Sequence, residues 1–211
     1  MINHALKLLG ATVLGAAASL VPAAAVADMF VRCDVLSGTE LGPDGERNWF
    51  IAESFGFGVE REMKESGEKG GSSEPATSAP SLSEIVVTKS MDIATVKLAQ
   101  YAIEGNSPGA CLIALTNGTD ANAKPICYLA YKLDRAFIKS WSTSGLDDER
   151  PTEEVAFYYS SLSTVFLIED GRQGAISQPM KWDNLKQSGW TGDVDEELLD
   201  LLGTTPPPRG D

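Results

Sequence analysis

Two strand-like segments joined by an acidic turn constrain the fold of this chain more than any other feature. Residues 140–159 have the pattern of a strand, a turn and a second strand, and another strand-like segment precedes them at 128–138. Three apolar side chains alternate along that earlier segment: Leu129, Tyr131 and Leu133. Such alternation is typical of a strand with one buried face. Pro151 has no N–H for a strand ladder, so it belongs in the turn or at the first residue of the next strand.

Other segments with strand character lie on both sides of this region. They are residues 29–36, 48–61, 83–89, 110–116, 126–138, 155–168 and about 175–183. Asn117-Gly118 is predicted to form a turn after the fourth of them, and Gly171 and Gly174 are predicted to lie in the last hairpin. Several short strands separated by turn residues predict a mainly β protein, either a sandwich or a barrel.

Residues 91–104 are the one segment with clear helical character. Its apolar positions are Ala94, Leu98, Tyr101 and Ala102. Ser90 is predicted to cap the helix, with Asp92 in its first turn, and Gly105 is predicted to end it. We expect the apolar face of this helix to pack against the core rather than to bind a cofactor.

The first 27 residues have the pattern of a secretory signal peptide. Lys7 supplies a basic start, residues 8–20 are apolar, and Ala25-Val26-Ala27 is a suitable cleavage site. The apolar run is shorter than the ~20 residues that a membrane-spanning helix needs. The sequence therefore predicts cleavage after Ala27 and a secreted or periplasmic mature protein without a membrane anchor.

Residues 28–190 are predicted to form one folded domain, and two segments differ from it in composition. Residues 62–81 are rich in Gly, Ser and Pro, which predicts a flexible loop. Residues 191–211 form an acidic tail that ends in a proline run. Five apolar residues in this tail could build a short amphipathic helix: Val194, Leu198, Leu199, Leu201 and Leu202.

Charge and residue usage exclude several classes of function. The net charge of -13 argues against binding nucleic acid or anionic membrane surfaces, which require basic patches. His4 is the only histidine and lies in the leader, which excludes Ser-His-Asp and Cys-His catalysis and histidine-ligated metal sites in the mature chain. The sequence also lacks a phosphate-binding loop motif.

The three cysteines, Cys33, Cys111 and Cys127, all lie in predicted strands. Cysteine in a strand often behaves as a small apolar core residue. An exported protein meets an oxidising compartment, where two of them could pair if their Cα atoms lie within ~7 Å. We therefore expect at most one disulfide, and the sequence leaves the pair open.

Acidic residues near the turn are the first candidates for chemistry: Asp147, Asp148, Glu149, Glu153 and Glu154. Two carboxylates could act as acid and base if burial separated their pKa values. Carboxylates around a turn that contains proline are normally solvated, so catalysis is not expected here. Arg150 could pair with these neighbours, although a surface ion pair contributes only ~0–1 kcal/mol.

Residues 193–197 are the second candidate, because Asp193, Asp195, Glu196 and Glu197 resemble half of a calcium-binding EF-hand loop. The glycine that such a loop requires is missing. Four tryptophans are expected in the core or at an interface rather than at a ligand site: Trp49, Trp141, Trp182 and Trp190. We therefore predict no catalytic, cofactor-binding or metal-binding residues.

The central segment also carries a family resemblance. Ser140-Trp141-Ser142-Thr143-Ser144-Gly145, followed by Glu149-Arg150-Pro151-Thr152-Glu153-Glu154-Val155, resembles the haemolysin-coregulated protein (Hcp) family. The Glu149 to Val155 run is its most specific part, and the resemblance extends over roughly residues 28–190. Further matching positions are Asp28-Met29-Phe30, Thr88-Lys89, Asp92, Leu98 and Trp182-Asp183.

This resemblance implies a fold and a function. The implied fold is an Hcp-like β-barrel, or two packed antiparallel sheets with one α-helix. The implied function is that of a tube protein of the bacterial type VI secretion system. Such a protein forms homohexameric rings, has a lumen that carries effector proteins, and meets spike and sheath proteins. It also implies that a loop near residues 62–81 contacts the next ring, and that the protein is not an enzyme.

The leader leaves an alternative open, since members of the family are normally loaded from the cytoplasm without one. The chain would then be a secreted binding protein on the same fold, outside any secretion tube. It would use the loop at 62–81 and the acidic tail to bind its partner.

Overall fold

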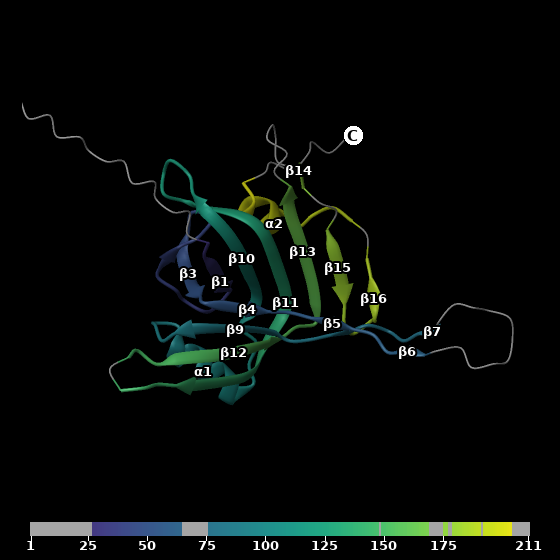
Figure 1. Cartoon of the computed structure of the whole chain (residues 1–211), viewed down its shortest axis with the longest axis horizontal. Coiled ribbons are helices and arrows are strands. Elements are labelled where there is room, and N and C mark those ends of the chain that lie inside the picture. The colour runs from purple at the N-terminus through teal and green to yellow at the C-terminus, as the bar shows by residue number, and fades with distance from the viewer. Residues whose placement is uncertain are drawn as a thin grey trace, which may run out of the picture.

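The structure is a computed structural model that describes residues 27–64, 76–147, 149–168, 175–176, 179–190 and 192–203. Within these ranges the chain consists mainly of antiparallel strands, with two short helices (Figure 1). The predicted fold class is therefore confirmed. The helix of the C-terminal tail, which the sequence only allowed, is present as a second helix.

One long sheet, which we call the main sheet, forms the frame of the fold. Its strands lie in the order β16-β15-β13-β11-β10-β1-β3-β2, and β14 pairs with the end of β13. Their bounds are β1 Met29–Cys33, β2 Glu40–Leu41, β3 Arg47–Ala52, β10 Gly109–Thr119, β11 Pro125–Ser144, β13 Ser161–Ile168, β14 Ala175–Ile176, β15 Met180–Asp183 and β16 Ser188–Gly189.

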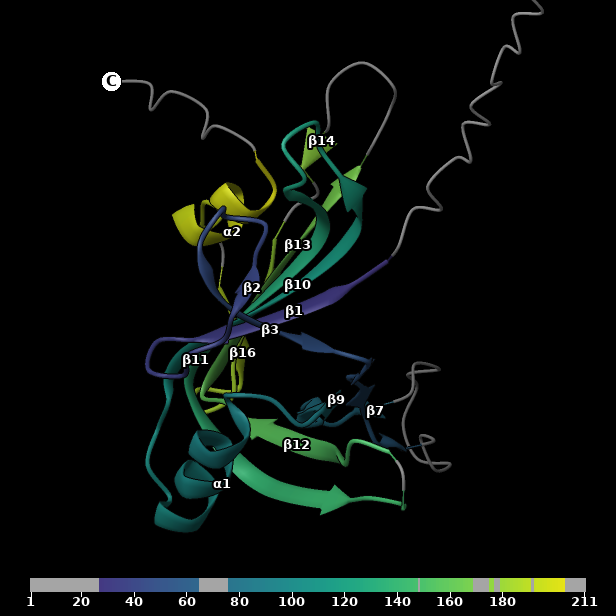
Figure 2. The ribbon, with the colours of Figure 1, turned by 90° about the vertical axis from the view of Figure 1, so that its left-hand side faces the viewer.

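A four-stranded sheet with the order β4-β9-β12-β11 shares the long strand β11 with the main sheet. Its other strands are β4 Ser54–Gly56, β9 Ile85–Ser90 and β12 Thr152–Tyr158. β11 pairs with β13 as far as Asp134 and with β12 from Phe137 onward. Arg135, between these two positions, has a φ of 46°, which is uncommon outside glycine. Figure 2 shows the resulting two layers, with the four-stranded sheet below the main sheet.

The central prediction of the sequence needs two corrections. β11 runs without interruption through both of the segments expected at 128–138 and from 140 onward. The single strand expected at 155–168 is instead two strands, β12 and β13, in different sheets. The break falls at Tyr159 and Ser160, whose backbone groups bond to Asn184 and Asp134 rather than to a continuing ladder.

Helix α1, Thr95–Glu104, confirms the predicted helix but begins later than expected. Ser90 is not its cap, because Ser90 ends β9 and donates from its N–H and hydroxyl to Glu53. The N-cap residue is Ala94, which makes no side-chain cap hydrogen bond, and the Asp92 carboxylate accepts from the Ala94 N–H just before the helix. Gly105 ends the helix as predicted, with a φ of 69° that favours glycine.

The turn predicted at Asn117-Gly118 is wrong. Both residues lie inside β10, next to an irregularity in its pairing with β11. The chain reverses slightly later, where the Asp120 carboxylate accepts from the backbone N–H groups of Asn122 and Lys124. These two hydrogen bonds lower the pKa of the Asp120 carboxyl, and the one from the Lys124 N–H has the larger effect. The hairpin predicted at Gly171 and Gly174 lies outside the described residues.

The strand predicted at 48–61 is divided, and short paired strands lie at the described ends of the segment predicted as a loop at 62–81. The strand is divided into β3, β4 and β5, Val59–Glu60, with breaks near Glu53 and Gly58. β5 pairs with β8, Ser81–Leu82, and β6, Met63–Lys64, pairs with β7, Ala76–Thr77. These pairs form a narrow ribbon that projects from the two sheets in Figure 1. Residues 65–75 lie outside the described residues.

Two apolar cores cover the opposite faces of the main sheet. The inner core lies between the two sheets and includes Val31, Phe50, Cys111, Ile113 and Leu133, with Leu98 of α1. The outer core lies on the other face and includes Phe30, Trp49, Leu112, Ala114 and Ala130. These residues alternate along each strand, as side chains of a strand must. Helix α2, Glu196–Leu201, covers the outer core with Leu198 and Leu201, and Leu202 follows it there.

A disulfide joins Cys33 of β1 to Cys111 of β10, which lie directly opposite one another in the inner core. This agrees with the expected limit of one disulfide. Cys127 belongs to the outer core, and burial raises the pKa of its thiol to about 12. Because the thiolate is the reactive form, Cys127 is expected to be inert in the folded protein.

We therefore predict that native protein at pH 8 incorporates less than about one tenth of an equivalent of a maleimide within an hour. After denaturation without reductant, the same protein should incorporate one equivalent, at Cys127, as read by intact mass. Rapid labelling of native protein would contradict this burial.

Candidate functional site

Lys89 and Glu153 form a buried ion pair between the two central strands of the four-stranded sheet. They lie opposite one another in the pairing of β9 with β12, and Lys89 Nζ is 2.5 Å from Glu153 Oε1. Both side chains are 0% exposed. Local sequence explains their direction, because Lys89 continues the inward series Ile85 and Val87, and Glu153 precedes Val155 with the same alternation.

Further hydrogen bonds satisfy the ammonium group of Lys89 and both carboxylate oxygens of Glu153. Glu153 Oε1 also accepts from the Thr95 hydroxyl at 2.9 Å, and Glu153 Oε2 accepts from the Trp141 indole N–H at 2.7 Å. Lys89 Nζ lies 2.7 Å from Asp92 Oδ1 and donates to the Ser90 carbonyl. The network therefore joins β9, β11, β12 and the start of α1. Its polar groups are paired with one another, which is the arrangement that lets charges remain in a core.

The acidic residues near the turn do not come together. Glu153 points inward, whereas Glu154 is exposed on the other face of β12, as neighbouring strand residues must be. The expectation of solvated carboxylates is thus wrong for Glu153. Asp147 and Glu149 are exposed, and Asp148 lies outside the described residues. Arg150 donates to the Met91 carbonyl at 3.5 Å.

The acidic residues of 193–197 contact lysines of the main sheet at the start of the C-terminal helix. Lys181 Nζ, which is largely buried, donates to the Asp193 carbonyl and lies 4.0 Å from Asp195 Oδ1. Glu197 Oε2 lies 2.9 Å from Lys132 Nζ. Among the residues that the structure describes, no group of three or more His, Cys, Asp or Glu side chains could hold a metal ion.

The four tryptophans occupy structural positions. Trp49 is buried in the outer core and donates to Asp44 Oδ1, and Trp141 donates to Glu153. Trp182 lies on β15, and the ring of Trp190 lies 5.8 Å from Lys181 Nζ.

The solvent-facing side of the four-stranded sheet is covered by small polar side chains. One row crosses all four strands in register: Ser54, Thr88, Glu154 and Ser142. Thr88, Glu154 and Ser142 line a shallow polar hollow of about 330 Å³ together with Thr143, Ser144, Thr152 and Glu153.

The two outer strands of this sheet have open edges. Within the described residues, β4 pairs only with β9, and residues 137–144 of β11 pair only with β12. The backbone N–H and C=O groups along an open edge can pair with a strand of another chain. Both outer strands of this sheet are therefore free to pair with another chain.

The sequence and the structure were compared with known proteins. A family model described as "Type VI secretion system effector, Hcp" matches residues 30–166, which is more than half of the chain. The chain belongs to the Hcp family. It is thus an Hcp-type structural protein of the type VI secretion system. A comparison with curated proteins gives no match.

Solved structures of Hcp proteins share this fold. A structure described as a type six secretion system protein is 21% identical, has a TM-score of 0.68, and the match covers 78% of this chain and all of that one. Hcp1 from Salmonella typhimurium is 19% identical with a TM-score of 0.59, covering 78% of this chain and 99% of the other. A type VI secretion effector from Yersinia pestis is 18% identical with a TM-score of 0.55, covering 74% and 99%.

Several of the positions that carried the resemblance to the Hcp family in the sequence lie at the buried ion pair. Lys89, Asp92 and Glu153 form its charged network, and Leu98 packs in the inner core. These residues therefore connect β9, β12 and the start of α1. Neither described helix has the length and apolar character needed to cross a membrane.

Proposed function

We propose that this chain is a tube subunit of a type VI secretion system that closes into a homohexameric ring. The observation that carries the proposal is the four-stranded sheet with open edges at β4 and at residues 137–144 of β11. Edge-to-edge contact between identical copies covers both edges at once, and a closed ring leaves none exposed. Membership in the Hcp family supports this mode of assembly.

The proposed ring has a lumen that carries effector proteins, and stacked rings meet spike and sheath proteins. The proposal includes no enzymatic activity, no cofactor and no nucleic acid partner. It also includes export, with the leader at 1–27 removed after Ala27 so that the mature domain starts at Asp28. The disulfide between Cys33 and Cys111 supports export, because disulfides persist mainly in oxidising compartments.

Charged side chains on the open edge of β11 are expected to block ring closure. Ser142 and Ser144 are exposed near the end of β11, and Ser142→Lys with Ser144→Lys would place two ammonium groups on the proposed contact. Lysine on an edge strand is a known obstacle to strand pairing. Repulsion and desolvation should raise the concentration at half-assembly by about tenfold or more, as measured by light scattering and particle images.

The control is Ser188→Lys, which places one lysine on β16 at the edge of the main sheet. This variant should assemble like the unchanged protein. A protein that stays monomeric from micromolar to millimolar concentration would refute the ring itself.

Shortening the ribbon is expected to separate ring formation from ring stacking. Replacing residues 66–75 by two glycines removes the tip and keeps the paired strands β6 and β7. Because this change leaves the strands β4 and β11 intact, single rings should form as before, and stacks should become several times shorter in particle images. Stacks of unchanged length would show that the tip makes no contact between rings.

The alternative is a secreted Hcp-fold binding protein outside any secretion tube. The observation that favours it is α2, because this helix lies beyond residue 166, where the family match ends. Capture of a defined partner by a monomeric protein would support the alternative, whereas closed rings support the tube.

A further inference from the structure

An apolar row crosses the inner side of the four-stranded sheet from one open edge to the other. In register, it consists of Trp141 on β11, Val155 on β12, Val87 on β9 and Phe55 on β4. The two central residues are fully buried, whereas Trp141 and Phe55 are only partly buried. The inner core therefore reaches the surface at both edges of the sheet.

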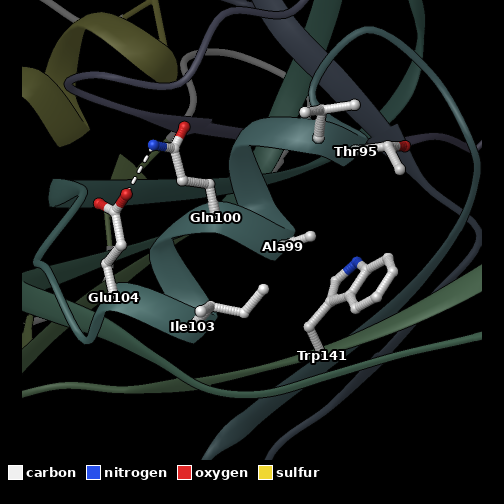
Figure 3. A pocket seen from close by; sticks show the side chains of 7 residues that line it. Thr95, Ala99, Gln100, Ile103, Glu104 and Trp141 are labelled. Carbon is white, nitrogen blue, oxygen red and sulfur yellow. Dashed lines mark hydrogen bonds between the residues drawn. The ribbon is translucent and has the colours of Figure 1, made fainter.

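At the Trp141 end, the outward face of α1 carries an apolar stripe bordered by the polar residues Gln100 and Glu104. Val96 is 75% exposed and Ile103 is 87% exposed, and they lie two turns apart on one side of the helix. With Ala99 between them, they border an apolar hollow of about 450 Å³ that also contains the Trp141 side chain (Figure 3). We call this surface the helix stripe.

At the Phe55 end, the inner face of the main sheet is left partly uncovered. Phe55 and Phe57 pack against Tyr131, with ring centroids 5.1 Å and 6.1 Å away. Beyond Tyr131, the same face continues through apolar residues placed by strand register: Met180 on β15, Phe166 on β13, Leu129 on β11 and Leu115 on β10. Met180 is 44% exposed and Phe166 is 43% exposed. We call these four residues the sheet patch.

We propose that the helix stripe of one copy packs on the sheet patch of the next copy in the ring. The inference rests on the proposed ring and specifies which surfaces meet. Trp141 belongs to the open edge of β11 and Phe55 to the open edge of β4. Pairing these edges between neighbours brings the two apolar surfaces together. Exposed apolar patches of this kind commonly mark interaction sites.

The occupant of the sheet patch is therefore a second copy of this chain, in a head-to-tail arrangement. Two different surfaces that fit one another produce a heterologous contact, which closes into a ring when the rotation between copies allows it. A two-fold dimer either brings like surfaces together or exchanges both contacts within one pair of chains. In either case its cross-linking ends at two chains, whereas the cross-linking of a ring continues to larger products.

The test uses cysteines at the two proposed surfaces. A double variant, Val96→Cys with Met180→Cys, should form disulfides between chains under mild oxidation by glutathione disulfide, which takes up the two electrons released. Non-reducing gels should show a ladder that ends at the closed ring. Each single variant should stay a monomer on the gel, because neither cysteine then faces its own kind. Cys127 stays in place, since it is buried.

The matched control is Val96→Cys with Asp200→Cys. Asp200 is exposed on α2, which covers the opposite face of the main sheet, so this pair should not cross-link. Cross-links in the single Val96→Cys variant, or none in the double variant although particle images show rings, would overturn the inferred contact and leave the ring standing. A wild-type chain that never assembles would overturn both the ring and the contact.

A second measurement does not depend on cysteine chemistry. Val96→Glu with Ile103→Lys puts charges on the helix stripe, and both side chains are exposed, so the thermal melting of the single chain should be unchanged. The concentration at half-assembly should rise by about tenfold or more, because the charges would be buried at the contact. Unchanged assembly of this folded variant would also overturn the inference.

Discussion

Replacing Lys89 by methionine is expected to lower the free energy of unfolding by about 3–5 kcal/mol. The change removes the cation from a fully buried pair and leaves Glu153 as an uncompensated charge in the inner core. Glu153→Gln should have a similar effect from the other side, although Asp92 still faces Lys89 and lessens it. Urea unfolding with the disulfide intact measures both variants.

The double variant, Lys89→Met with Glu153→Gln, should be clearly more stable than the sum of the two single effects predicts. No fully buried charge remains in it. The single glutamine carbonyl oxygen can accept from the Trp141 indole N–H, while its NH2 group faces the Thr95 hydroxyl, which can accept. The matched control is Lys139→Met, because Lys139 pairs with Glu84 at the surface. An exposed pair contributes only ~0–1 kcal/mol. Equal losses for Lys89→Met and Lys139→Met would contradict the buried network.

Leu198→Ala is expected to cost about 2–5 kcal/mol, because the leucine is fully buried in the outer core. Leu198 contributes to the face of α2 that covers the main sheet next to Trp49 and Leu112. Loss of its side chain leaves a cavity under a helix of only six residues, which has little stability of its own. Urea unfolding measures the loss.

Asp200→Ala is the control for this prediction, since Asp200 lies on the exposed side of the same helix. Its effect should stay within about 0.5 kcal/mol. A further readout is the total tryptophan fluorescence, whose Trp49 contribution should shift to longer wavelength if the helix leaves the sheet. Equal stability of the Leu198 and Asp200 variants would mean that α2 does not contribute to the outer core.

The sequence was sufficient to predict the strand character of most segments, the helix and the cap at Gly105. The burial of Lys89 and Glu153 was also readable, because alternation with Val87 and Val155 places both on the inward side. What the sequence could not supply was the pairing of β9 with β12, which turns two costly buried charges into a stable pair. Carboxylates near a turn were expected to be solvated. For Glu153 this is wrong, because the two-residue alternation of β12 directs its side chain inward.

Other errors have similar local causes. Asn117-Gly118 has the composition of a turn, yet pairing with β11 keeps it inside β10 and moves the reversal to Asp120. Ser90 has a side chain suited to capping, but its pairing partners hold it at the end of β9. The open edges and the apolar surfaces beside them depend on contacts between distant segments. Alternation along a single strand therefore could not indicate them.

The burial of the disulfide between Cys33 and Cys111 limits when this bond can form. Its sulfur atoms belong to side chains that are 2% and 0% exposed, so no oxidant can reach them once β1 and β10 have packed. Oxidation by thiol–disulfide exchange proceeds through a mixed disulfide, and oxidation by peroxide through a sulfenic acid, and both need open access to one sulfur. The bond must therefore close while the chain is still folding. Its redox state is a permanent record of the compartment in which that molecule folded, and intact mass can read that record long after assembly.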